Sequence, residues 1–546
     1  MLFDKTLLWA GLLLWASWIM RAGVVAAQMF QIEEYEPPRF LTWCLRRPWL
    51  AMRAVQVGAA LLVISIIIGI PLPVSLRLTV WRVGFAGALV CLHLLWRWPT
   101  AKKPLVYTLR MRRILSASAG ATLIVALLFG LGLSVFPAPL QSVLLLLAVA
   151  LAPLMTALLV LAGNVAMSPV EALIRQSFLR KARERVANVA PKVVAVAGSY
   201  GKTSTKHIAA QLLSHQIETL ATPKSFNTLM GVTRTINENL EDKHKLFIVE
   251  MDAYGPGEIR VMARLVAPTV GIVTSVGPQH LERFGTVAKI EDALFELPEE
   301  LPDQGTALIY AGDPLSAQLA SRARQLSRRV LCYGMEGETD TGLDIVASAV
   351  TFIGEMTRFV WRWEAEGFCI PVTIPLLGKH NVLNTSVALA LVHLLGLSVE
   401  QAARDAEKLE FVQHRLQLIK GAGGVTVIDD SYNANPVGVR NGLEVLKQLP
   451  GRQKILVTPG LVELGSLQEQ ENHHYGELAA QACHWVILVG PEQTKSIRDG
   501  LQSAGFDASR IHIVRTLDEV TTLLGQISRP GDVILFANDL PDTYLE

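Results

Sequence analysis

The stretch VVAVAGSYGKTSTK at residues 193–206 decides the fold of the larger part of this chain. Its first five residues are small and apolar, which predicts a buried parallel strand. Gly198 to Gly201 then form a tight loop, and a helix opens at about Thr203. Such a loop directs backbone N–H groups at an anion, and the helix N-terminus adds positive potential. The stretch predicts a phosphate-binding turn, with a plain glycine-rich turn as the alternative.

Three side chains near this turn have the chemistry of a magnesium–nucleotide site. Lys202 supplies a positive charge for the β- and γ-phosphates, and the Thr203 hydroxyl is a ligand type for Mg²⁺. A second apolar strand, at residues 245–250, ends in Glu250. A carboxylate at the carboxyl end of a strand beside a phosphate loop is suited to hold Mg²⁺. We therefore expect ATP and Mg²⁺ as cofactors.

Composition limits the partners and the chemistry. The chain has 546 residues, enough for three or four domains, and a net charge of +2, which favours no nucleic-acid partner. Its five cysteines are far apart and form no CxxC pair. This dispersed, odd set argues against a disulfide framework or a zinc site.

The first third of the chain predicts a membrane domain, residues 1–165. Mean hydropathy is +0.35 for the whole chain, and the apolar excess lies in five stretches, at about 6–30, 54–72, 78–96, 114–136 and 140–163. Each is long enough, or nearly so, to cross a bilayer of about 30 Å. The basic loops place the N-terminus outside and everything after residue 165 in the cytoplasm. We therefore expect a multi-pass protein of the inner membrane, in contact with the lipid bilayer.

The remaining chain predicts three further parts. Residues 166–190 are basic and amphipathic and predict a linker helix on the membrane surface. Residues 191–412 predict a central α/β P-loop ATPase domain with a parallel sheet, and the short β-like runs at 306–375 predict a flanking sheet. Residues 413–546 alternate strands and helices, which predicts a separate C-terminal Rossmann-like α/β domain.

Several motifs together resemble the Mur ligase family over about residues 191–546. They are GSYGKTSTK, the strand that ends in Glu250, His280, GKHNVLN at 378–384 and DDSYNANP at 429–436. The last motif is similar to that of the members that add a dipeptide. The resemblance implies a ligase that phosphorylates a carboxylate with ATP and lets an amine capture the acyl phosphate. It implies an amino acid or dipeptide and a carboxylate acceptor as partners.

The family's functional residues transfer to matching positions of this chain. The resemblance implies Lys202, Glu250, His280 and Arg415 as catalytic residues, and Thr203, Glu250 and His280 as metal ligands. It implies nucleotide binding by Gly198, Ser199, Tyr200, Gly201, Lys202, Thr203, Ser204, His380, Asn381, Arg415 and Asp430. It implies substrate binding by Asn227, Thr228, Tyr432, Asn433 and Asn435.

The chain also departs from the family pattern. Membrane spans stand where the family has a soluble UDP-binding domain, which favours a lipid-linked or membrane-proximal acceptor. The slot of the lysine that becomes carbamylated between two metals is Leu294, followed by Glu296, while Lys289 lies five residues earlier. Ser225 and Ser275 replace asparagines that the family tends to have.

Two alternatives remain open at this point. A membrane-bound ligase of the poly-γ-glutamate type also combines membrane spans with a Mur-like ATPase. A non-catalytic nucleotide-binding membrane sensor, or a transporter, is the alternative of a different class. The octapeptide DDSYNANP favours a ligase of cell-wall precursor synthesis over these alternatives. The missing UDP domain favours the ligase of the poly-γ-glutamate type.

Overall fold

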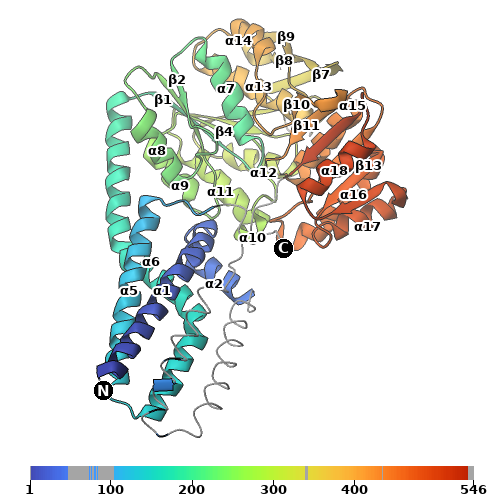
Figure 1. The fold of residues 1–546 in the computed structure, drawn as a ribbon. Helices are drawn as coiled ribbons and strands as arrows, with labels where there is room; N and C mark the ends of the chain where they lie inside the picture. The colour runs from blue at the N-terminus through green and yellow to red at the C-terminus, as the bar shows by residue number, and fades with distance from the viewer. Residues whose placement is uncertain are drawn as a thin grey trace. The chain divides into compact units, whose positions relative to one another are not determined.

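The structure is a computed structural model that describes residues 2–46, 104–338, 342–432 and 434–538, with isolated positions between 47 and 103. The chain divides into two compact units, Met1–Gln176 and Ser177–Glu546 (Figure 1). Each unit is described by itself.

The first unit is helical where it is described. Its helices are α1 (Leu2–Ile32), α2 (Pro37–Arg46), α5 (Leu109–Leu133) and the first part of α6 (Ala138–Val189). Three stretches are long and apolar enough to cross a membrane, namely Leu8–Ile32, Leu109–Leu133 and Leu154–Val189. The expected spans at 54–72 and 78–96 lie outside the described residues.

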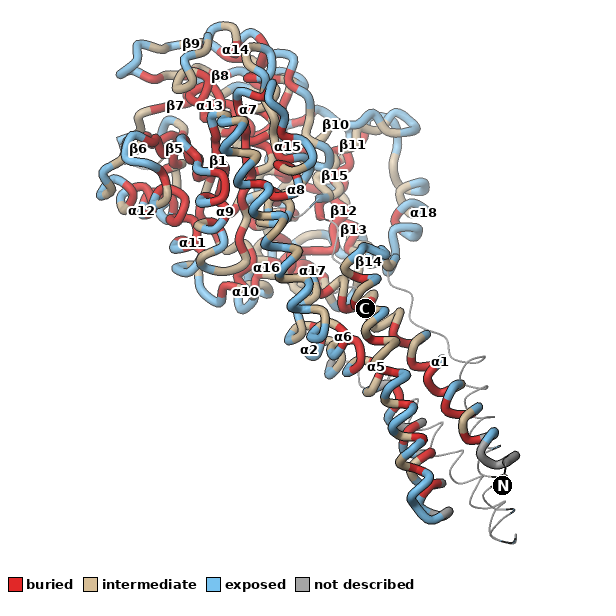
Figure 2. Tube along the Cα trace, turned by 90° about the vertical axis from the view of Figure 1, so that its left-hand side faces the viewer, coloured by how far each residue is buried: buried red, intermediate tan, exposed pale blue. Residues whose placement is uncertain are grey.

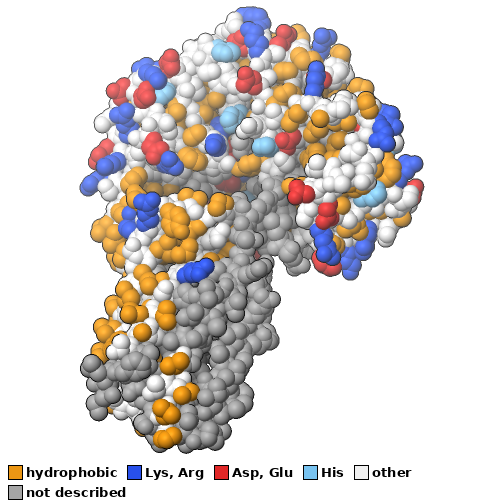
Figure 3. Space-filling view, in the orientation of Figure 1, with side chains coloured by type: hydrophobic (Ala, Val, Ile, Leu, Met, Phe, Trp, Pro, Cys, Tyr) orange, Lys and Arg blue, Asp and Glu red, His pale blue; other side chains and the backbone are white. Residues whose placement is uncertain are grey.

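The outer surfaces of α5 and α6 are apolar. Leu128 on α5 is 62% exposed, and Leu154 and Leu158 on α6 are 57% and 51% exposed. Figure 3 shows hydrophobic side chains spread over the visible, described part of these helices. An apolar surface of this extent is costly in water and is typical of a surface that contacts lipid or another protein.

The expected linker helix at 166–190 is not a separate element, because α6 runs without a break from Ala138 to Val189. The dipeptide Ser168-Pro169 resembles a helix start, yet it lies inside α6. Proline has no N–H to donate to the carbonyl of Val165, four residues earlier. The Ser168 hydroxyl donates to that carbonyl instead, at 2.8 Å. This replacement bond explains how the helix passes through a proline.

The second unit contains a nine-stranded sheet in the order β2-β3-β1-β4-β5-β6-β7-β8-β9. The pairs from β2 to β7 are parallel, and β8 and β9 extend the sheet with antiparallel pairs. The expected flanking sheet at 306–375 thus joins the same sheet. The strands are β1 (Lys192–Ala197), β2 (Thr219–Ala221), β3 (Leu246–Glu250), β4 (Val270–Val273), β5 (Thr306–Tyr310), β6 (Arg329–Met335), β7 (Ile345–Ile353), β8 (Met356–Trp363) and β9 (Phe368–Ile374).

Alternate residues of β1 belong to two different cores, as expected for a strand covered on both faces. Val193, Ala195 and Ala197 pack with α8, α9, α11 and α12, whereas Val194 and Val196 pack with α7, α13 and α14. Figure 2 shows β1 as a buried segment among helices. These helices are α7 (Lys202–Ser214), α8 (Leu229–Asn239), α9 (Glu258–Val266), α10 (Leu281–Phe284), α11 (Val287–Glu300), α12 (Pro314–Ala323), α13 (Lys379–Leu394) and α14 (Val399–Asp405).

A second sheet forms the C-terminal lobe, in the order β10-β11-β15-β12-β13-β14. Only the pair of β10 with β11 is antiparallel. The expected strands at 454–458, 485–489, 511–514 and 532–536 are confirmed to within one residue. The elements are β10 (Gln417–Lys420), β11 (Thr426–Asp430), α15 (Pro436–Gln448), β12 (Lys454–Thr458), α16 (Gln468–Ala482), β13 (Trp485–Val489), α17 (Lys495–Ser503), β14 (Ile511–Val514), α18 (Leu517–Ile527) and β15 (Val533–Ala537).

Candidate active site

The phosphate loop joins β1 to α7 and depends on two glycines. Gly198 and Gly201 have φ of 141° and 84°, a region that L side chains rarely adopt. A side chain at Gly198 would also collide with the Thr274 hydroxyl. The Tyr200 N–H donates to the Ser275 hydroxyl at 3.0 Å. The loop is thus fastened to the segment after β4, and Ser275 takes part in that support.

Lys202 reaches across the loop toward the carboxyl end of β3. Its Nζ donates to the Gly198 carbonyl at 2.6 Å and to Gln279 Oε1 at 3.2 Å, and it lies 3.1 Å from Asp252 Oδ1. The side chain is buried, with 5% exposed. The ammonium group is therefore held by oxygen atoms at the place where phosphates would bind.

Glu250 is the most constrained carboxylate of the site. Its Oε1 accepts from the Thr203 hydroxyl at 2.9 Å and from Asn227 Nδ2 at 3.0 Å. Its Oε2 accepts from Lys206 Nζ at 2.8 Å. Glu250 and Lys206 are 1% and 0% exposed, and Lys206 also donates to the Lys224 carbonyl. The buried ion pair fixes the Glu250 carboxylate so that one oxygen faces Thr203.

These donors fit one magnesium ion. Mg²⁺ prefers hard oxygen ligands and usually binds through one or two carboxylates together with substrate phosphates and water. Thr203 and Glu250 offer a hydroxyl and a carboxylate in contact with each other. Among the described residues, no three His, Cys, Asp or Glu side chains are grouped so as to hold a metal by themselves. The arrangement suits an ion that arrives with a nucleotide.

His280 lies at the other end of this polar group. Its Nε2 is 4.0 Å from Asp252 Oδ2, and its Nδ1 is 2.7 Å from Glu463 Oε2. The Tyr254 ring lies 4.6 Å from the imidazole, centroid to centroid. His280 therefore lies beside the second carboxylate of the site and contacts the C-terminal lobe. It is linked to Glu250 through Asp252 and Asn227.

His380, at the start of α13, lies in the same cavity. Burial, reinforced by the Arg415 guanidinium, lowers the pKa of His380 to about 4, so its imidazole is neutral at pH 7. Its Nδ1 is buried without a hydrogen-bond partner. Asn381 does not line the cavity, because its Nδ2 donates to the Leu377 carbonyl at 2.9 Å. Asn384, one turn later, lines the cavity and accepts from the Thr205 hydroxyl at 2.9 Å.

The C-terminal lobe adds Arg415, Asp430 and Tyr432. The Arg415 guanidinium lies over the Tyr432 ring, 4.6 Å from its centroid. Burial raises the pKa of Asp430 to about 7, although the Arg415 charge and a hydrogen bond from Leu416 N–H act in the opposite direction. The Tyr432 hydroxyl contacts the Ser225 hydroxyl of the central lobe. The expected residues from both lobes thus meet at one place.

The remaining expected residues have structural partners. Ser199 Oγ donates to the Gly277 carbonyl at 2.9 Å. Thr228 caps α8, and Asn435 caps α15 by accepting from Gly438 N–H at 2.8 Å. Ser204 and Asn435 also line the cavity. Asn433 lies outside the described residues.

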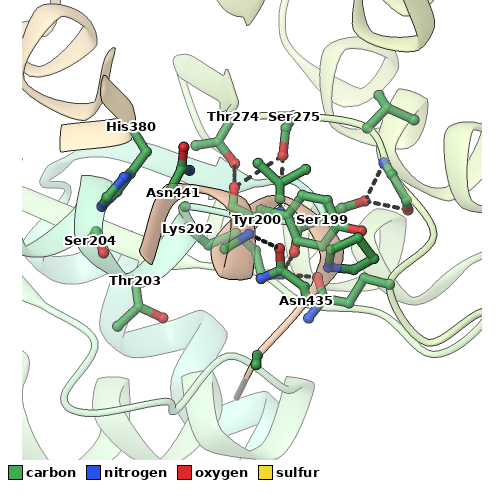
Figure 4. Close-up of a pocket in the computed structure, with 18 of the residues that line it drawn as sticks. Ser199, Tyr200, Lys202, Thr203, Ser204, Thr274, Ser275, His380, Asn435 and Asn441 are labelled. Atoms are coloured by element: carbon green, nitrogen blue, oxygen red, sulfur yellow. Dashed lines mark hydrogen bonds between the residues drawn. The ribbon is translucent and has the colours of Figure 1, made fainter. Parts of the chain in front are cut away.

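Most of these groups line one cavity of about 720 Å³, although Asn381 and Lys206 do not. This volume is within the range of small-molecule sites. Figure 4 shows Lys202, Thr203, Ser204 and His380 of the central lobe around it, together with Asn435 and Asn441 of the C-terminal lobe. A phosphate loop, a carboxylate of the kind that binds Mg²⁺, and amide and charged side chains from a second lobe lie in one cavity. This combination suits transfer of a phosphoryl group between bound partners.

Comparison with known proteins agrees with this geometry. The family model of the Mur ligase middle domain matches residues 196–392, and that of the "Mur ligase, glutamate ligase domain" matches residues 414–538. A UDP-N-acetylmuramoyl-tripeptide–D-alanyl-D-alanine ligase of Mycobacterium bovis is 32% identical over 362 residues, which is 63% of this chain and 69% of the relative. The chain belongs to the Mur ligase family. The corresponding ligase of Bacillus subtilis is 31% identical over 356 residues, 65% of this chain and 74% of that protein.

Solved structures of Mur ligases have the same fold. MurF from Acinetobacter baumannii superposes with a TM-score of 0.60 at 28% identity, over 68% of this chain and 78% of that one. MurF from Thermotoga maritima in complex with ADP superposes with a TM-score of 0.59 at 25% identity, over 68% and 81%. Members of the Mur ligase family are ATP-dependent ligases, which makes this cavity the candidate active site.

The second metal that Mur ligases imply does not fit the residues at the Leu294 position. Leu294 is 6% exposed and packs in the core with Phe284 and Ile290. It also borders a small cavity of about 10 Å³ beside Asp252 and His280, which is room for at most about one water. Lys289 is exposed. Glu296 accepts hydrogen bonds from the backbone N–H groups of Gly257 and Arg260 and thereby caps α9.

Sequence reasoning missed Asp252, Gln279 and Glu463, which line the cavity, and Lys206, which binds Glu250. Asp252 follows Glu250 by two positions, and the period of a strand would place both carboxylates on one side. Gln279 is adjacent to His280 and binds Lys202. No local signal identified Lys206 or Glu463, whose partners lie 44 and 183 residues away.

Proposed function

We propose that this Mur ligase is a membrane-bound, ATP-dependent amide ligase that adds an amino acid or a dipeptide, such as D-alanyl-D-alanine, to a carboxylate of a cell-wall precursor. One observation carries the proposal. Lys202 and Thr203 of the phosphate loop line the same cavity as Arg415, Asp430 and Asn435 of the C-terminal lobe. The domain limits that we propose are 1–165, 166–190, 191–412 and 413–546, where the second part is the last portion of the continuous helix α6.

The proposed reaction has two steps. A carboxylate oxygen of the acceptor attacks the γ-phosphorus of ATP, and ADP leaves. The amine then attacks the acyl carbon, the C–O bond to phosphate breaks, and the amine loses a proton. Two anions must approach in the first step, so catalysis depends mainly on positioning and on charge compensation.

The chain's own residues supply that compensation. Lys202 is already held by oxygens of the loop and by Asp252, so little reorganisation is needed when phosphates replace those contacts. When bound, Mg²⁺ would neutralise phosphate charge, with Thr203 and Glu250 as its ligands. Arg415 would add positive charge from the C-terminal lobe, and contacts between the lobes would exclude water from a reactive acyl phosphate.

The nature of the two substrates is part of the proposal. D-alanyl-D-alanine and a UDP-linked tripeptide appear in the names of the relatives. In this chain, both matched segments follow residue 195, and the described residues before it include three helices long and apolar enough to cross a membrane. We infer a multi-pass protein of the inner membrane with its catalytic lobes in the cytoplasm. This location favours an acceptor at the membrane face, such as a lipid-linked muramoyl peptide.

The test measures phosphate release by the full chain in nanodiscs with ATP and Mg²⁺. The amine substrates to be tested are D-alanyl-D-alanine, D-alanine and L-glutamate. Each is combined in turn with a UDP-linked and with a lipid-linked tripeptide as the carboxylate acceptor. Release only with D-alanyl-D-alanine and one of the tripeptides is expected. Release with L-glutamate alone would favour a poly-γ-glutamate-type ligase. Nucleotide binding without release for any pair would favour a sensor.

Localisation has its own test. In inside-out vesicles, a protease should remove the catalytic lobes, whereas in right-side-out vesicles it should not. Cleavage in right-side-out vesicles only would contradict the proposed orientation.

A further inference from the structure

One part of the active-site cavity differs in chemistry from the rest. Around Lys202 the walls carry charged groups, such as Asp252 and His280. Beyond the carboxyl ends of β5 and β6, the walls are formed by Leu315, Tyr310, Tyr333 and Met335. The Tyr310 and Tyr333 rings lie 5.8 Å apart, centroid to centroid. Aromatic and apolar walls suit the flat faces of a nucleobase, whereas they do not suit phosphate or carboxylate.

Two carboxylates, Asp313 and Glu338, belong to the lining beside the apolar walls. Of these two, Glu338 does not cap a helix. Asp313, the other lining carboxylate, accepts from Ser316 N–H at 2.9 Å and from the Ser316 hydroxyl at 2.7 Å, and so caps α12. Glu338 instead receives one hydrogen bond on each oxygen. The Tyr310 hydroxyl donates to Oε1 at 3.1 Å, and the Met335 N–H donates to Oε2 at 2.8 Å.

Two glycines make room for this carboxyl group. A side chain at Gly312 would collide with Glu338 and with the Tyr310 hydroxyl, and a Cβ at Gly334 would lie 3.2 Å from Glu338 Oε2. The Glu338 carboxyl is therefore seated against the backbone and held in one orientation, with free lone pairs on both oxygens. Such a group is preorganised to accept a further hydrogen bond from a ligand.

We propose that Glu338 is a specificity-determining residue that accepts a hydrogen bond from the exocyclic amino group of the bound adenine. This inference rests on the proposed use of ATP. The position of the base follows from the sheet order β1-β4-β5-β6. The phosphate loop follows β1 and Glu338 follows β6, three strands further along the same edge, and both line the cavity. Burial raises the pKa of both Glu338 and Tyr310, which keeps Tyr310 a donor.

The test compares two ligands that differ in a single amino group. Binding of ADP and of purine riboside 5′-diphosphate, which lacks the 6-amino group, is measured by titration calorimetry on the full chain in detergent. For the unmodified protein, ADP should bind about ten-fold more tightly, as a hydrogen bond to a charged group implies. In Glu338→Ala, the two ligands should bind within about two-fold of each other, because the acceptor is gone.

Matched variants separate this role from a general effect on the fold. Glu336→Ala changes an exposed carboxylate of the same turn that binds Arg362 and should keep the ten-fold preference. Tyr310→Phe removes only the hydroxyl that orients Glu338 and should reduce the preference in part. If Glu338→Ala does not fold, the unmodified protein still decides, because equal binding of the two ligands would overturn the inference.

Further outcomes distinguish the alternatives. A folded Glu338→Ala protein that keeps the preference for ADP over purine riboside 5′-diphosphate, but loses a preference for ADP over 2′-deoxy-ADP, would show that Glu338 contacts the ribose. The inference would then be wrong. If the unmodified protein binds neither diphosphate, the proposed use of ATP fails, and with it the reason to place a base here.

Discussion

The imidazole Nδ1 of His280 lies 2.7 Å from Oε2 of Glu463, and these residues belong to the two different lobes of the second unit. Glu463 has a left-handed backbone, with φ of 63°, which is unusual for a residue other than glycine. Its carbonyl also accepts from Glu282 N–H at 3.3 Å. Together with the contact between Ser225 and Tyr432, these hydrogen bonds join the two lobes in a closed arrangement.

Loss of the Glu463 carboxylate should weaken this closure. A hydrogen bond to a charged group contributes about 1.5–3 kcal/mol, and a partly exposed one contributes less. We expect Glu463→Gln to lower kcat about three- to ten-fold, with a smaller change in the KM for ATP. Limited proteolysis should cut the segment between residues 408 and 417 faster. Glu469→Gln, an exposed position on α16, is the control, and an equal loss in both variants would contradict a specific role.

Removal of the Lys202 charge should weaken nucleotide binding while the membrane unit stays folded. In Lys202→Met, the loss of charge-assisted hydrogen bonds of about 1.5–3 kcal/mol predicts an affinity for ADP about 10- to 100-fold lower. Activity should fall at least as far. Fluorescence titration with a labelled ADP measures the change, and Lys420→Met, an exposed lysine on β10, should bind normally. Full activity in Lys202→Met would refute the assigned role.

The buried pair of Lys206 and Glu250 predicts a stability effect. Removal of one partner of a buried ion pair leaves an uncompensated charge and costs about 3–5 kcal/mol. We expect Lys206→Met to lower the free energy of unfolding by that amount, and Lys206→Met with Glu250→Met to recover part of it. Denaturant unfolding of the full chain gives both values. Lys243→Met, which removes an exposed pair with Glu241, should have no measurable effect. A loss of stability in the double variant equal to the sum of the two single losses would show that the pair is not coupled.

Much of the fold followed from local patterns, and the failures have physical causes. The five apolar residues before Gly198 and the strands of the C-terminal lobe were predictable, because continuous apolar runs between turn residues are typical of buried parallel strands. A linker helix separate from the last span was expected at 166–190, whereas α6 runs through Pro169. The compensating bond of Ser168 to Val165 is not visible in a local pattern. Asp252, Glu338 and Glu463 became evident only when the fold brought distant segments together, since no spacing rule links residues across a cavity.

The apolar side chain at Leu294 predicts that activity does not require carbamylation. The resemblance places the modified lysine of the family at this position, but the side chain here is buried in the core. The lysine five residues earlier is exposed. We expect equal rates, within about two-fold, in buffers freed of carbon dioxide and in buffers with added bicarbonate. A rate that rises several-fold with bicarbonate would show that a lysine elsewhere in the chain is modified.

Asp430 predicts a change of stability with pH. Burial raises its pKa from 3.8 to about 7 in the folded chain, so the folded state holds this proton more tightly than the unfolded state. Stability is therefore not reduced by this group below about pH 4. It falls as the pH rises toward 7, and it stays reduced above that value.

Replacement of Asp430 by asparagine should remove this dependence. In the absence of nucleotide, Asp430→Asn should gain stability relative to the unmodified chain as the pH rises from 4 to 7, and the gain should then level off. Its size should lie between about 1 and 4 kcal/mol, because each unit of pKa corresponds to about 1.4 kcal/mol and the partly buried side chain keeps some contact with water. Urea unfolding of the full chain at pH 5, 6, 7 and 8 measures the difference. A constant difference across this range would mean that Asp430 is ionised in the folded protein, with Arg415 as a sufficient counter-charge.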